Sequence, residues 1–184
     1  MIRLSKPIIT ERGSQMDFST RAKDEITGLM TDEISRLIEA GEIQHQVELE
    51  NGIRALLQQV GQQTYGEVLE REDEKQGRRV GCACGAQALR IAKRKAQILS
   101  VFGWVGYHRS YYGCAVCGRK RHHLDQLWGL HPGAVSPVMG KLLGIAGVDI
   151  AFERAQRKIQ EFLLVEVSDN TIRKQTQQIG QKQA

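Results

Sequence analysis

Long apolar runs are missing from this 184-residue sequence, and with them the segment of roughly 20 residues that a membrane-spanning helix needs. The first residues, from Met1 to Pro7, also lack the apolar centre of a secretory signal peptide. Aromatic residues make up only 5% of the chain, but hydrophobic residues together reach 41%, which is enough to bury a core. We therefore expect a soluble, intracellular protein.

Cysteine is also scarce, but its four copies fall into two close pairs. These are Cys82-Ala-Cys84-Gly85 and Cys114-Ala-Val-Cys117-Gly118, with 29 residues between Cys84 and Cys114. Two pairs joined by a hairpin are the layout of a zinc ribbon, in which each pair supplies two thiolates to one metal ion. The glycine after each pair suits a tight turn that directs backbone amides toward the sulfurs. The sequence thus predicts one structural Zn²⁺ held by Cys82, Cys84, Cys114 and Cys117.

Disulfide bonding, redox chemistry and iron binding are the rival roles for the cysteines. Disulfides are rare inside cells, and the chain shows no signal peptide. A redox dithiol at Cys114 and Cys117 leaves Cys82 and Cys84 unexplained. Iron takes the same four thiolates in a rubredoxin-like site and stays open as an alternative metal. His122 and His123 follow the second pair closely, but with four cysteines already paired we expect them to be polar surface or phosphate-contacting residues.

Charge is distributed unevenly along the chain. Residues 1–76 carry 9 Lys and Arg against 15 Asp and Glu, whereas residues 77–184 carry 17 against 6. The basic part is suited to a polyanion such as nucleic acid, although a basic surface is often only solvated.

The distribution of apolar residues predicts three segments. Residues 1–76 are expected to form helices over about 17–40 and 43–70, either as an assembly arm or as ordinary packing helices, with glycines that weaken or break the second. Residues 72–80 are interpreted as a linker. Residues 77–131 form the zinc-ribbon segment, with strands over 96–102 and 104–112 that turn at Gly103. Residues 132–184 return to helices, at about 136–147 and 150–164. The fold class is therefore mainly α with a small β zinc ribbon.

The last segment is suited to a helix-turn-helix. Ala155 is small enough for two helices to cross, and Ser168 and Asp169 are placed to begin the second helix. A recognition helix enters the major groove of DNA with its first residues, and Asn, Gln and Arg side chains read base edges there. The alternative is an amphipathic helix pair with a solvated basic face. The candidate DNA-binding residues of the whole chain are Arg94, Lys95, Arg109, Arg119, Lys120, Arg121, Asn170, Arg173, Lys174 and Gln177.

Residues 80–180 carry a set of motifs that resembles a known family. The motifs are Cys82-x-Cys-Gly, Phe102-Gly-x-Val105, Arg109-x-Tyr-Tyr-x-Cys114-x-x-Cys-Gly118, Leu124-Asp125, Leu127-Trp-Gly-Leu130, Ala151-Phe-Glu-Arg-Ala155 and Val167-Ser-x-x-Thr-Ile172. Together they resemble the N-terminal region of ISKra-type insertion-sequence transposases. The resemblance implies binding to double-stranded DNA at transposon ends, in a bacterial cytoplasm or nucleoid. The N-terminal helices themselves suggest a homo-oligomer.

In that family an RNase-H-like domain with an Asp-Asp-Glu triad follows the zinc-binding region. No carboxylate occurs here after Asp169, and none of the six acidic residues beyond position 76 makes a convincing triad. Asp125 and Asp149 are better explained as structural residues. We therefore expect a transposase portion without its catalytic domain and without enzyme activity of its own. The rival hypotheses are a stand-alone zinc-ribbon regulator or protein-binding adaptor, and an active nuclease or thiol oxidoreductase.

Overall fold

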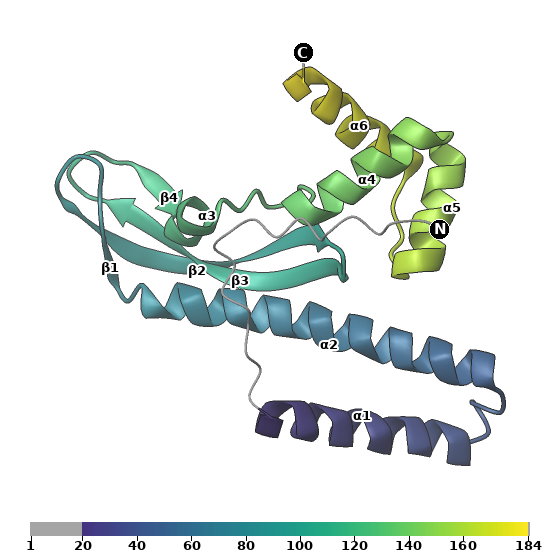
Figure 1. Cartoon of the computed structure of the whole chain (residues 1–184). Coiled ribbons are helices and arrows are strands. Elements are labelled where there is room, and N and C mark those ends of the chain that lie inside the picture. Colours follow the sequence, from purple (N-terminus) through teal and green to yellow (C-terminus); the bar gives the residue numbers. More distant parts are fainter. Residues whose placement is uncertain (1–19, 184) are drawn as a thin grey trace. The chain divides into compact units, whose positions relative to one another are not determined.

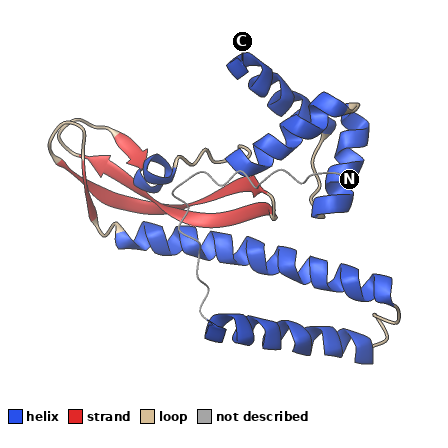
Figure 2. Ribbon diagram, in the orientation of Figure 1, coloured by secondary structure: helices blue, strands red, loops and turns tan. Residues whose placement is uncertain are grey.

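A computed structural model describes residues 20–183 of the chain, so that residues 17–19 of the first expected helix lie outside the described part. The described residues form six helices and four strands (Figures 1 and 2). In chain order they are α1 (Thr20–Glu39), α2 (Gln46–Lys75), β1 (Arg79–Gly81), β2 (Gln87–Ser100), β3 (Gly103–Cys114), β4 (Lys120–His122), α3 (His123–Trp128), α4 (Pro137–Asp149), α5 (Phe152–Leu163) and α6 (Asp169–Gln183). A mainly helical chain with a small antiparallel sheet is confirmed.

The chain divides into two compact units, and the division falls inside α2 between Ile53 and Arg54. In the first unit, Ile34 of α1 and Ile43 of the loop before α2 are both buried, and they face Gly52 near the beginning of α2. Gly52 allows this contact, because a Cβ atom at that position would lie 3.1 Å from Ile43 and 3.3 Å from Ile34. The first unit is thus a helical hairpin with a narrow apolar seam.

In the second unit, α2 runs as one unbroken helix along β3 to Lys75. The prediction that glycines interrupt this helix, and that residues 72–80 are a linker, is wrong: residues 72–75 continue α2 and Arg79 begins β1. A Cβ at Gly61 would lie 2.4 Å from the ring of Phe102, and one at Gly66 would lie 2.7 Å from the carbonyl oxygen of Gly106. These glycines therefore let the helix approach the hairpin closely.

The sheet has the strand order β1-β2-β3-β4, with every neighbouring pair antiparallel. Its centre is the long β2–β3 hairpin, which turns at Val101 and Phe102 and continues at Gly103 with a φ of +91°. The predicted turn is confirmed, although β2 begins at Gln87, well before the expected residue 96. One face of the hairpin is covered by a cluster made of Leu69, Ile98, Val105, Tyr107, Leu124 and Leu130.

Helices α4, α5 and α6 pack on one another and on the turn end of β2. Their shared cluster contains Leu99, Met139, Leu143, Ala155, Ile159, Val165, Val167 and Ile172. Ser136 caps α4 by accepting a hydrogen bond from the amide of Met139, and Ser168 accepts one from the amide of Thr171 at the start of α6. The predicted starts of both helices are thereby confirmed, and Ala155 is fully buried in the shared cluster.

None of the helices within residues 20–183 combines the length and apolar character that a membrane crossing requires.

Candidate metal centre

Two short turns carry the four cysteines. The first joins β1 to β2, where the amide of Cys82 donates to the carbonyl of Ala86 and the amide of Gly85 donates to the carbonyl of Cys82. The second joins β3 to β4 in the same way, with the amide of Cys114 bonded to the carbonyl of Arg119 and the amide of Gly118 bonded to that of Cys114. Each turn therefore repeats the same two backbone bonds.

Glycine is required where each turn reverses. Gly85 has a φ of +85° and Gly118 a φ of +69°, in the left-handed region that residues with a Cβ rarely adopt. The glycine after each cysteine pair therefore permits the turn, as the sequence predicts.

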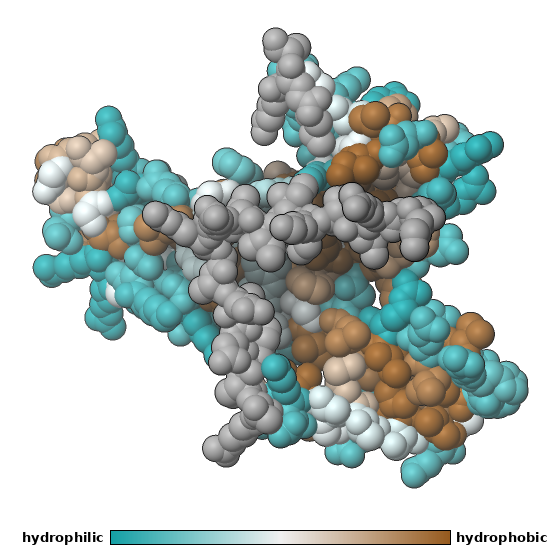
Figure 3. All heavy atoms as spheres, in the orientation of Figure 1, coloured by the Kyte–Doolittle hydropathy of each residue, from teal (hydrophilic) through white to brown (hydrophobic). Residues whose placement is uncertain are grey.

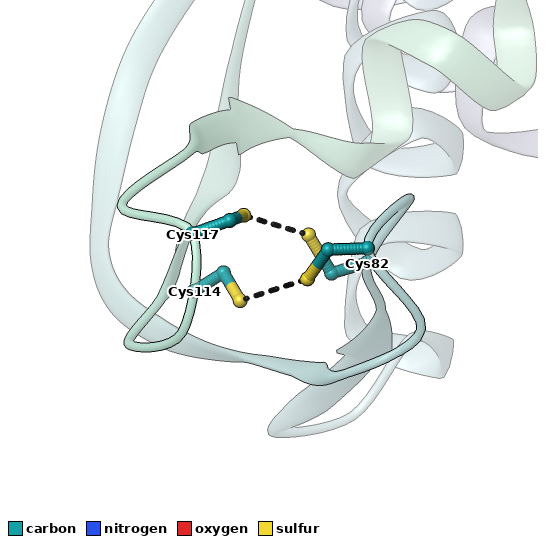
Figure 4. A group of neighbouring side chains, drawn as sticks. Cys82, Cys114 and Cys117 are labelled. Atoms are coloured by element: carbon teal, nitrogen blue, oxygen red, sulfur yellow. Dashed lines mark hydrogen bonds between the residues drawn. The ribbon is translucent and has the colours of Figure 1, made fainter.

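The register of the central hairpin brings the two turns together. Cys114, the last residue of β3, pairs with Ala88 near the beginning of β2, so both turns lie at the same end of the sheet. The sulfurs of Cys82 and Cys117 are 3.5 Å apart and those of Cys84 and Cys114 are 3.7 Å apart. All four sulfurs lie within 4.8 Å of one another (Figure 4). The structure thus places the four predicted residues in one group able to hold a metal ion.

The spacing of the sulfurs suits a tetrahedral ion. With Zn–S bonds of about 2.3 Å, the edge of a sulfur tetrahedron is about 3.8 Å. The four thiols are free rather than joined as disulfides, and a disulfide bond would need sulfurs about 2.05 Å apart. Four sulfurs facing one another from two turns therefore match a four-thiolate ligand set.

Backbone amides donate hydrogen bonds to the sulfurs of this group and so favour the thiolate form of the cysteines. The amides of Cys117 and Val116 donate to the sulfur of Cys114, and the pKa of that thiol falls to about 6. The amide of Cys84 likewise lowers the pKa of Cys82. At Cys117 the amide of Arg119 favours the thiolate, but removal from water and the three neighbouring cysteines outweigh it and raise the pKa to about 11. Without a cation, therefore, the last thiol of the group keeps its proton.

A small apolar cluster lies under the centre. Val80, Ala88, Tyr112 and Cys114 are buried together, with Cys82 and Ala86 partly buried against them. The hydroxyl of Tyr112 donates to the carbonyl of Gly77, which fastens the loop between α2 and β1 to this cluster. The cysteine end of the sheet thus has a core of only a few side chains.

The cations nearest the cysteines have different surroundings. Arg119 and Lys120 are exposed beside the second turn. Arg121 is half-buried, and its guanidinium donates to the carbonyl of Gly81, directly before Cys82, and to the side chain of Gln126 at 3.0 Å. Arg121 therefore links β4 to the first cysteine turn as well as adding positive charge.

Arg109, which was expected at the DNA surface, points into the protein. It forms an ion pair with Asp125 in α3, and only 12% of its side chain is exposed. Burial lowers the pKa of its guanidinium. The structural interpretation of Asp125 agrees with this pair, whereas Arg109 is poorly placed for a phosphate.

The remaining candidate residues lie at the surface. On β2, Lys95 is exposed, and the exposed Arg94 stacks on the ring of Tyr111 at 3.9 Å. On α6, Asn170, Arg173, Lys174 and Gln177 are all exposed. These positions are distant in sequence from the cysteines and are not gathered with them in the metal centre.

The two histidines after the second pair are outside the sulfur group. His122 contacts the carbonyl of Ser110 through Nδ1 at 3.1 Å, and its ring lies against Tyr111. Burial lowers the pKa of both His122 and His123. Both are half-buried rather than fully exposed, and the expectation that they contact a phosphate stays a prediction.

Sequence reasoning missed the acidic residues of α2 that bind the free edge of β3. Asp73 is fully buried and accepts hydrogen bonds from the amide and the hydroxyl of Ser110 at 2.9 and 2.6 Å. Glu70 accepts from the amide of His108 and contacts its ring nitrogen. These partners are 37 and 38 residues apart, and no local pattern indicates such pairs.

Neither a protein-family model nor a curated protein matches this chain.

Proposed function

We propose that the four cysteines hold one structural Zn²⁺ in a zinc ribbon, and that the chain is the DNA-binding portion of an insertion-sequence transposase that recognises transposon ends. The observation that carries the metal assignment is the group of four sulfurs within 4.8 Å. Four thiolates fill the tetrahedral coordination of Zn²⁺ and leave no position for a substrate, so the ion would stabilise structure rather than catalyse a reaction.

Support for DNA as the ligand comes from charge and placement. Residues 77–184 carry 17 Lys and Arg against 6 Asp and Glu. Arg119 and Lys120 project beside the centre, and Arg173 and Lys174 lie on the exposed side of α6. Phosphates bind such cations irrespective of sequence, whereas Asn170 and Gln177 are of the type that reads bases.

The helix-turn-helix remains part of this proposal. Five residues, 164–168, separate α5 from α6, and Leu164 ends α5 with a φ of +55°. Ala155 and Ile159 of α5 are buried in the same cluster as Ile172 of α6. Such packing supports a rigid helix pair that presents the beginning of α6 to a groove.

Metal analysis of the purified protein tests the first half of the proposal. We expect one zinc per chain, and thiols that titrate only after chelation or denaturation. Freely titrating thiols with no bound metal would overturn the assignment, and iron in place of zinc would correct the identity of the ion.

DNA binding is tested by fluorescence anisotropy with a labelled duplex at increasing salt. If the cations neutralise several phosphates, the logarithm of the affinity falls linearly with the logarithm of the salt concentration. Exchange of Arg173 and Lys174 for Gln should weaken binding and flatten the slope, because two phosphate contacts are lost. Affinity that hardly changes with salt would contradict the proposal.

A protein-binding adaptor is the second candidate, and the first unit favours it. Ile26, Leu29, Ile38 and Val47 are exposed there, and Figure 3 shows apolar side chains gathered over α1 and the beginning of α2. A homo-oligomer formed through these helices is compatible with either candidate. Sedimentation of the whole chain, with and without Leu29→Glu, distinguishes self-association from a monomer.

A further inference from the structure

One stretch of the central hairpin is open to solvent on the face opposite the Leu69 cluster. It consists of Lys95 and Gln97 on β2, with Trp104, Gly106 and His108 on β3, and we call these five residues the sheet window. Lys95 pairs with His108 across the hairpin, and Gln97 pairs with Gly106. All five are exposed. Residues two apart on a strand share a face, so Trp104, Gly106 and His108 form one row.

Both ends of this face are covered, which limits the window to its middle. Toward the cysteines, Asp73 contacts Ser110 and Tyr112 contacts Gly77, so the end of α2 and the following loop lie over the strand. Toward the turn, Leu99 is buried in the cluster with α4, α5 and α6, and its cross-strand partner Trp104 therefore lies at the border of the window. The open part therefore spans only a few residues of each strand.

A cavity of about 440 Å³ lies in the window. It is lined by Glu70, Lys95, Ala96, Gln97, Gly106, Tyr107 and His108. Gly106 supplies no side chain at its centre, and a Cβ added there would meet no atom within 4 Å. The fold therefore leaves the space above Gly106 free, and the backbone conformation at this position does not require glycine.

Trp104 lies two residues before Gly106 on the same face of β3, and it lines a separate pocket of about 380 Å³ together with residues of α2 and with Leu164. It is one of only two tryptophans in the chain, and 45% of it is accessible to solvent. An exposed aromatic ring that can stack a base, together with a cation that can contact its phosphate, is the combination found in proteins that bind single strands. Lys93 pairs with Glu74 at 3.0 Å, so Lys95 is the cation inside the window.

We propose that the sheet window binds an unpaired nucleotide of single-stranded DNA, with its base stacked on Trp104 above Gly106 and its phosphate contacted by Lys95. This inference rests on the proposed function, because it assumes that the chain binds DNA, and it adds a second mode of contact. A duplex hides the faces of its bases, whereas a single strand exposes them to an aromatic side chain. Gln97 and His108 can hydrogen-bond to the base edge.

Glu70 is the one acidic residue that lines the cavity. Its carboxylate accepts from the amide of His108 and contacts the ring nitrogen at 2.9 Å, so it is bound to the wall of the cavity. It still repels a phosphate. Glu70→Gln should therefore raise the affinity for single-stranded DNA by about twofold, the size expected of one exposed charge.

The test uses the metal-loaded full chain with Trp128→Phe, which leaves Trp104 as the only tryptophan. Titration with a twelve-nucleotide oligo(dT) should quench its fluorescence in a saturable manner, because stacking brings the base against the indole. A duplex of the same length should quench it far less. Unquenched fluorescence while anisotropy reports bound oligo(dT) would overturn the inference.

Two variants measure the contribution of the window to affinity. Trp104→Ala should weaken oligo(dT) binding by about tenfold and leave duplex binding unchanged. Trp128→Ala is the matched control, since Trp128 is similarly exposed (50%) but lies in α3, and it should change neither affinity. Equal losses from Trp104→Ala and Trp128→Ala would contradict a specific role for the window.

Gly106→Val is a second variant that fills the cavity and should not disturb the fold. The free space at Gly106 should accept a β-branched residue, so the fold is retained while the cavity is filled. Loss of oligo(dT) binding with an unchanged circular dichroism spectrum and duplex affinity supports the window. Retained oligo(dT) binding overturns it and leaves the proposed DNA binding intact, whereas no binding of either DNA by the unaltered chain means that the proposed function itself has failed.

Discussion

The two ends of the central hairpin are held in different ways. At the cysteine end, the buried side chains are Val80, Ala88, Tyr112 and Cys114, and two of the four thiols are exposed. At the turn end, Leu99 joins seven other buried residues, contributed mainly by α4, α5 and α6. One end therefore carries four thiols that could hold a metal ion, whereas the other is held by the burial of apolar surface.

A metal ion held by the four cysteines would contribute to stability mainly at that end of the sheet. Apolar burial stabilises a structure in proportion to the area removed from water, so the large cluster at Leu99 can hold its end without help. The small cluster at the cysteines contributes much less. Four thiols packed this closely also disfavour full ionisation unless a cation is present, as the raised pKa of Cys117 indicates. Metal binding should therefore stabilise one end of the sheet selectively.

Removal of the metal is expected to have the largest effect. Structural zinc supplies folding free energy of about 10–16 kcal/mol in small zinc domains, and here it should concentrate on residues 78–88 and 114–122. After chelation, hydrogen exchange in these segments should accelerate by orders of magnitude, while amides of α4 and α5 stay protected. If the metal is shown to be lost and the amides at both ends stay equally protected from hydrogen exchange, the proposed difference between the two ends is wrong.

Acid should reproduce the effect of chelation. Protons compete with the metal for the thiolates, so affinity falls as the pH falls and metal is released on the acid side. Readdition of zinc at neutral pH should restore protection of the same amides. Cys117→Ser serves as the variant that weakens the site without removing a buried side chain, since Cys117 is exposed.

The sequence predicts the ligand set because its signal is local. Each cysteine pair and its glycine form one turn, and Gly103 marks the hairpin that brings the turns together. Prediction from the sequence fails where a residue's role is decided by a contact with a residue far away along the chain. Gly61 and Gly66 resemble helix breakers, but they face Phe102 and Gly106 and allow α2 to pack against the hairpin. Arg109 resembles a phosphate contact until its pairing with Asp125, sixteen residues away, is known.

Leu99→Ala tests the apolar end. Loss of a fully buried leucine creates a cavity and should lower the free energy of unfolding by about 2–5 kcal/mol. Leu89→Ala is the matched control on the same strand, because Leu99 is 2% exposed and Leu89 is 50% exposed. The control should change stability by less than about 1 kcal/mol. Chemical denaturation measures both, and zinc content should stay unchanged in each.

Asp73→Ala tests the contact along the side of the hairpin. The substitution leaves the buried amide and hydroxyl of Ser110 without their acceptor, which should cost about 1–3 kcal/mol. Glu74→Ala is the control on the adjacent position, since Glu74 is exposed and pairs only at the surface with Lys93. Equal stability of the two variants would show that α2 contributes little to holding β3.

Ser168→Ala should have the smallest effect. It tests whether α6 unfolds together with the rest of the apolar end or opens independently. The hydroxyl of Ser168 accepts a hydrogen bond from the amide of Thr171 at 3.2 Å, and loss of such a cap costs about 1 kcal/mol. Ile172, one residue further along α6, is buried in the cluster with Leu99. If the helices and the turn end of the sheet unfold together, Ser168→Ala should lower the stability of both equally. Faster exchange confined to α6 would instead show that this helix opens alone and that the cluster holds the hairpin without it.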